Sequence, residues 1–136
     1  AYVSYDFGPL ALTVTNYTFP DGDGTYSSGS FLEGDLEISA STEISGLSLM
    51  GGYFPDLETL YIEAGFGLGE VDFAIGFGSD SADAFYVGAR ESAICNVSFG
   101  YSKEIKITDD YSLPLFSSFI FNPKSEAAFI VFGASF

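Results

Sequence analysis

An alternation of large apolar residues with acidic or small residues recurs along this chain and constrains its fold most. In VDFAIGFG, which begins at Val71, every second residue is large and apolar. Successive side chains of a β-strand point to opposite faces, so this period of two predicts strands. Turn-forming residues separate nine such segments, and no stretch of helical length keeps a 3.6-residue period. The segments are Tyr2–Phe7, Leu10–Phe19, Phe31–Ala40, Leu47–Phe54, Leu60–Leu68, Val71–Phe77, Ile94–Ile105, Leu113–Phe121 and Ala128–Phe136. The sequence therefore predicts an all-β antiparallel meander of adjacent hairpins.

Charge and composition exclude several classes of function. The 136 residues contain 19 acidic and 4 basic side chains, with a formal net charge of −15, and no Lys or Arg precedes Arg90. A nucleic-acid partner is not expected, because binding phosphates requires Lys and Arg. The chain has no His and a single cysteine, Cys95, so neither an internal disulfide nor a Cys/His metal site is expected. No run reaches 18 apolar residues, which argues against a membrane-spanning helix.

Two architectures fit the alternation. A soluble β-sandwich or small barrel buries the apolar face, whereas a transmembrane barrel turns it toward lipid and lines its lumen with small or polar residues. The recurrence of the apolar pattern on nearly every strand favours the barrel, as does the abundance of glycine on the opposite face. Aromatic residues near strand ends suggest interfacial girdles: Tyr17, Phe19, Tyr53, Phe54, Phe119 and Phe121. We predict a single domain, 1–136, that forms an antiparallel up-and-down transmembrane β-barrel or its C-terminal part, with about eight or nine strands.

The alternation also assigns side chains to the two faces of this predicted barrel. The residues expected to face lipid are Leu36, Ile38, Ile62, Phe73, Ile75 and Phe132. The acidic residues expected to face the lumen are Glu33, Asp35, Glu37, Glu63 and Asp72. By the same alternation, Cys95 shares a face with Val97 and Phe99, so we expect its side chain to point toward lipid.

The C-terminal segment AAFIVFGASF resembles the β-signal of bacterial outer-membrane proteins, which the barrel assembly machinery recognises. Its assembly-signal residues would be Ile130, Phe132 and Phe136. The last quarter of the chain, KEIKITDDYSLPLFSSFIFNPKSEAAFIVFGASF, resembles a family of outer-membrane, porin-like β-barrel proteins of Bacteroidetes, which are Gram-negative bacteria. The resemblance implies a bacterial outer-membrane location, the lipid bilayer and the assembly machinery as partners, and no catalytic motif.

The number of strands raises a question of closure. Bacterial single-chain barrels have an even number of strands and both termini on the periplasmic side. Nine strands leave the two termini on opposite sides. The short connections GP, STEISG, GLGE and TDD would be periplasmic, and PDGDGTYSSGS and the stretch GSDSADAFYVGARES would be external. Either the count of strands differs by one, or the chain lacks an N-terminal portion. We favour the second explanation and expect a missing N-terminal segment or another chain to complete the barrel.

Few residues suggest specific chemistry. Asp21 and Asp23, in DGDGT, are weak candidate Ca²⁺ ligands, but the twelfth position of the loop is Leu32 where an EF-hand has a bidentate Glu. A solvated turn explains them better, so we expect no metal site. Carboxylates on one face could act in pairs as in glycosidases, yet no marker separates acid from base. We expect no cofactor and no catalysis. The function is then a porin-like channel that favours cations or a structural membrane-embedded subunit. The alternative is an acidic soluble or secreted β-protein with a binding or structural role.

Overall fold

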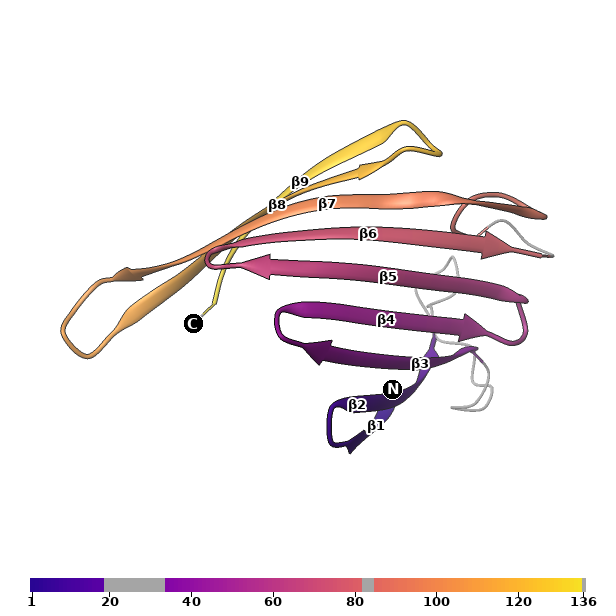
Figure 1. The fold of residues 1–136 in the computed structure, drawn as a ribbon, viewed down its shortest axis with the longest axis horizontal. Coiled ribbons are helices and arrows are strands. Elements are labelled where there is room, and N and C mark those ends of the chain that lie inside the picture. The colour runs from indigo at the N-terminus through magenta and orange to yellow at the C-terminus, as the bar shows by residue number, and fades with distance from the viewer. Residues whose placement is uncertain (19–33, 82–84, 136) are drawn as a thin grey trace.

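The computed structural model describes residues 1–18, 34–81 and 85–135, and every strand in these residues belongs to one antiparallel sheet (Figure 1). Nine strands are present, and each pairs with its sequence neighbours in the order β1 to β9. Their bounds are β1 Tyr2–Phe7, β2 Leu10–Tyr17, β3 Asp35–Ile44, β4 Leu47–Phe54, β5 Thr59–Leu68, β6 Val71–Asp80, β7 Glu91–Lys106, β8 Ser112–Asn122 and β9 Ala127–Ala134. The prediction of an all-β antiparallel meander is confirmed.

Tight turns connect the strands at one end of the sheet. Phe7 pairs with Leu10 across Gly8 and Pro9, and Ile44 pairs with Leu47, so both connections are two-residue hairpin turns. Ser45 and Gly46 have φ values of 53° and 81°, which is the left-handed conformation that a type I′ turn requires at both central residues. The five-residue connection 107–111 between β7 and β8 lies at the same end, whereas β6 ends and β7 begins at the opposite end of the sheet (Figure 1).

All nine predicted segments overlap an observed strand, and the main difference lies in β3. The sequence predicted that this strand ends at Ala40 and that STEISG forms a connection. The strand instead continues to Ile44, because Thr42 and Ile44 extend the alternation and only Ser45 and Gly46 form the turn. β6 and β7 are also longer than predicted, which shortens the connection between them to 81–90.

The pairing register divides the side chains of the strands into two faces. One row across the sheet joins Leu49, Ala64, Ile75 and Val97, and the adjacent row joins Met50, Glu63, Gly76 and Asn96. We call the first set and its in-register neighbours the apolar face, and the second set and its neighbours the polar face. On the apolar face of the nine strands the only charged residue is Lys103, near the end of β7 where the tight turns lie.

The sheet has almost no hydrophobic core. Among the described residues the buried apolar side chains are Phe54, Val87 and Cys95. Residues in the middle of the apolar face are about half exposed, including Ile62 at 48% and Ile75 at 48%. Because the described strands form a single layer, none of them covers this face.

The two edges of the sheet are open in the part of the chain that the structure describes. β9 pairs with β8, as predicted, and β1 pairs with β2, but β1 and β9 do not pair with each other (Figure 1). The sheet is therefore not closed into a barrel, and closure stays a prediction. No helix in the described ranges has the length and apolar character needed to cross a membrane.

Candidate functional site: the polar face of the sheet

The predicted site residues separate cleanly between the two faces. Register places Asp35, Glu37, Glu63 and Asp72 on the polar face. It places all six residues that were predicted to face lipid on the apolar face: Leu36, Ile38, Ile62, Phe73, Ile75 and Phe132. The assignment of these faces to lumen and lipid stays a prediction. Glu33, the Ca²⁺ candidates Asp21 and Asp23, and the terminal Phe136 lie outside the described residues.

Glu63 stands in a hydrogen-bonded group that spans three strands. The Tyr61 hydroxyl, two residues earlier on β5, donates to Glu63 Oε2. Asn96 Nδ2, on β7, donates to the same oxygen at 2.7 Å and to the Tyr61 hydroxyl at 3.2 Å. Gly76, on the intervening strand, leaves the space that these side chains occupy. The side chains of β5 and β7 thus meet across β6, over the space that Gly76 leaves open.

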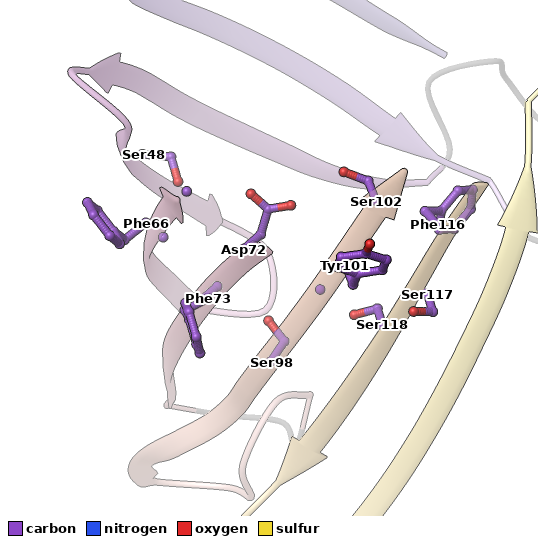
Figure 2. A pocket seen from close by; sticks show the side chains of 14 residues that line it. Ser48, Phe66, Asp72, Phe73, Ser98, Tyr101, Ser102, Phe116, Ser117 and Ser118 are labelled. Carbon is purple, nitrogen blue, oxygen red and sulfur yellow. The ribbon is translucent and has the colours of Figure 1, made fainter. Parts of the chain in front are cut away.

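Asp72 lies apart from this group, beside a hollow lined by serine and glycine residues and by aromatic side chains. Figure 2 shows Asp72 on β6 with Ser48, Ser98 and Ser118, which come from three other strands. The hollow has a volume of about 350 Å³. The serine and glycine residues leave room beside Asp72 on this part of the polar face.

A segment of the β6–β7 connection, Phe85–Gly88, folds over the polar face at the end opposite the tight turns, and we call it the strap. Asp80, the last residue of β6, is 2% exposed, and its Oδ2 accepts hydrogen bonds of 2.8–3.0 Å from the backbone N–H groups of all four strap residues. Four N–H groups that converge on one carboxylate form a strong anion site, so Asp80 holds the strap in place.

The strap builds an aromatic cluster against Glu37. Phe85 lies 5.0 Å from Phe54 and 4.8 Å from Tyr86 between ring centroids. Tyr17 lies 5.7 Å from Phe54 and donates its hydroxyl proton to Glu37 Oε2 at 3.0 Å. Burial, together with the negative charge of Glu37, raises the pKa of Tyr86 to about 12, so this phenol stays neutral at physiological pH.

Two predictions about side-chain direction are wrong. Cys95 was expected toward lipid, but it is buried on the polar face, with its thiol close to Gly78. The reason is a β-bulge: Asn96 pairs with Gly76 while Ile94 pairs with Phe77, so Cys95 is an extra residue that shifts the alternation by one.

The second error concerns the aromatic girdle. Tyr17 and Phe54 were expected to contribute to an interfacial belt, but both lie in the aromatic cluster on the polar face. Tyr53, Phe119 and Phe121 do lie on the apolar face, in line with the prediction. Phe19 lies outside the described residues.

Chemically, the polar face offers separated acidic sites. The groups around Glu37, Glu63 and Asp72 each have their own neighbours and share no hydrogen bond that the structure records. Within the described ranges no three His, Cys, Asp or Glu side chains are grouped so that they could hold a metal ion. Alternation could not identify the strap or its anchor Asp80, because neither the connection nor the hydrogen bonds have a period. A signal was present, however, in the two aromatic residues of the loop sequence AFYVGAR.

Comparison with known proteins adds no family to these observations. No protein family, curated protein or solved structure matches this chain. Any function must therefore be argued from the sheet itself.

Proposed function

We propose that this chain forms the wall of a bacterial outer-membrane β-barrel, with its apolar face in lipid and its polar face toward the lumen. The observation that carries the proposal is the uncovered apolar face, which crosses nine strands with Lys103 as its only charge. In water such a face costs free energy of about 25 cal/mol per Å² of apolar surface. In a bilayer the same surface is the one that a transmembrane barrel presents.

Dimensions and aromatic placement support the proposal. β5 and β6 have 10 residues each, which matches the 9–11 residues with which a tilted strand crosses a bilayer. On the apolar face Phe66, Phe73, Phe99 and Phe119 pair in register across four successive strands. Such a row is typical of the aromatic girdle at a membrane interface. On the apolar face of β7, Lys103 follows Phe99 and Tyr101. A lysine near a membrane interface can extend its ammonium group to the lipid headgroups.

The open edges define what the barrel still requires. Each unpaired backbone group costs several kcal/mol in lipid, so β1 and β9 need partners there. Further strands, from this protein or from another chain, would supply them and give an even total. A barrel of about eight strands is filled by side chains, and only larger ones hold a water channel. The protein thus acts as a cation-preferring, porin-like channel or as a structural membrane-embedded subunit, without catalysis.

Planar-bilayer recording tests this proposal. We expect the full chain, purified from the outer membrane of a Gram-negative host, to resist extraction by alkaline carbonate. If the lumen is open, it should conduct with a reversal potential that indicates K⁺ preference over Cl⁻, because the polar face is acidic. Asp72→Asn should reduce that preference, whereas the turn variant Asp110→Asn should not.

Insertion without conductance would identify the structural subunit. A chain that carbonate releases into the soluble fraction would contradict both forms of the proposal and favour the soluble alternative. The proposed roles of Ile130, Phe132 and Phe136 in assembly, and the barrel assembly machinery as a partner, stay predictions. The first two are exposed on β9, at 65% and 77%, where an assembly factor can reach them.

A further inference from the structure

A pocket of about 290 Å³ lies between the strap and the strands β2, β3 and β4. Its walls are four aromatic rings and two carboxylates: Tyr17, Phe54, Phe85, Tyr86, Asp35 and Glu37. The rings contact one another at centroid distances of 4.8–5.7 Å and are tilted rather than stacked flat. Tilted and edge-to-face contacts are the usual packing of aromatic rings, and the packed rings here leave the pocket open beside Asp35 and Glu37.

The two carboxylates of this pocket have no cationic partner in the described residues. Lys106 pairs with Asp109 and Lys124 pairs with Glu91, while Lys103 lies on the apolar face. Arg90, the remaining basic side chain, forms no ion pair with either carboxylate. The pocket thus combines two carboxylates with four aromatic rings in its walls, and no basic side chain of the described residues pairs with those carboxylates.

We propose that this pocket binds a small organic cation with a methylated ammonium group. Such a cation is attracted to ring faces and is large enough to contact several of them at once. A bare metal ion would need more oxygen ligands, and no suitable group of three acidic side chains exists among the described residues. The volume is at the lower end of the range for ligand pockets, which suits a ligand of a few heavy atoms.

Asp80 acts as a positioning residue for this site. Its carboxylate accepts the backbone N–H groups of Phe85 and Tyr86 at 3.0 and 2.9 Å, so it fixes where those two rings stand. It does not line the pocket itself. The pocket depends only on these contacts, so the inference holds whether the apolar face lies in lipid or against another protein.

Calorimetric titration of the full chain in detergent micelles with choline tests the inference. The neutral isostere 3,3-dimethylbutan-1-ol is the reference ligand, since it has the same shape without the charge. We expect choline to bind at least about tenfold more tightly than the isostere. Glu37→Gln should weaken choline binding about tenfold and leave the isostere unchanged, because the glutamine oxygen can still accept the Tyr17 hydroxyl.

Glu43→Gln is the matched control, since Glu43 is on the same strand and face but outside the pocket. It should leave choline binding unchanged, and Phe85→Leu should weaken it without altering the circular dichroism of the sheet. Equal affinity for choline and the isostere would overturn the inference. So would equal effects of Glu37→Gln and Glu43→Gln, or no choline binding to a folded wild-type chain. None of these outcomes bears on membrane insertion, which the proposed function predicts separately.

Discussion

At the scale of single residues, glycines shape the polar face by leaving room for larger neighbours. At Gly78 a Cβ atom would lie 2.6 Å from Tyr86 Cβ, 3.1 Å from Cys95 Sγ and 3.3 Å from Val87 Cγ1. The first of these atoms is one bond from the strap backbone, so it cannot move without moving the strap. The strap therefore packs directly against the backbone of Gly78.

Gly78→Ala should destabilise the protein by about 1–3 kcal/mol, because the added methyl group overpacks a site that is already filled. The measurement is the denaturant midpoint of the full chain in detergent. Gly51→Ala on β4 is the control, since a Cβ there would meet its nearest atom, the Tyr61 carbonyl oxygen, at an ordinary 3.8 Å. We expect the control to change stability by less than about 0.5 kcal/mol. Equal effects would show that the strap does not pack as described.

At the scale of elements, the strap differs from the other connections that the structure describes because a buried carboxylate holds it. Charge-assisted hydrogen bonds are the strong ones, and here four converge on Asp80 Oδ2. Without that acceptor, the four backbone N–H groups would need water molecules as hydrogen-bond acceptors. The strap would then leave the polar face, and the rings of Phe85 and Tyr86 would leave with it.

Asp80→Ala should increase amide hydrogen exchange at Phe85–Gly88 by about 10–100-fold, because a hydrogen bond to a charged group contributes about 1.5–3 kcal/mol. Exchange in the central strands should not change. Asp72→Ala provides the control, since Asp72 is on the same strand and the same face but does not contact the strap. Unaltered exchange in the Asp80 variant would contradict the anchoring role.

The elements also mark the limit of what alternation can predict. The strands followed from period two because each strand keeps one face apolar, and so did the opposite placement of Glu63 and Ile62. The bulge at Cys95 could not be predicted from the alternation. One extra residue between two regular stretches leaves the pattern within each stretch unchanged. The hydrogen bond between Tyr61 and Asn96 depends on the pairing register of segments that are distant in the sequence. The lengths of the turns and the bulge together determine that register.

At the scale of the whole molecule, the described sheet leaves its apolar face uncovered. In packed domains a second layer of secondary structure covers the apolar face of a sheet. Here the apolar face of nine strands has no cover within the described chain, and the buried apolar residues lie on or above the polar face. In the proposed barrel, lipid would cover the apolar face and additional strands would pair with the open edges.

Nitroxide scanning along β6 tests the lipid assignment of the apolar face most directly. Single cysteines replace Val71, Asp72, Phe73, Ala74 and Ile75 in turn, in a Cys95→Ala background, and the labelled chains are reconstituted in phospholipid bilayers. Oxygen concentrates in lipid and a nickel chelate stays in water, so the two quenchers report the two environments. We predict high oxygen accessibility at 71, 73 and 75, and low oxygen with higher nickel accessibility at 72 and 74. Labels at 71, 73 and 75 that neither quencher reaches, with 72 and 74 exposed to water, would contradict the account and indicate a soluble packed sheet.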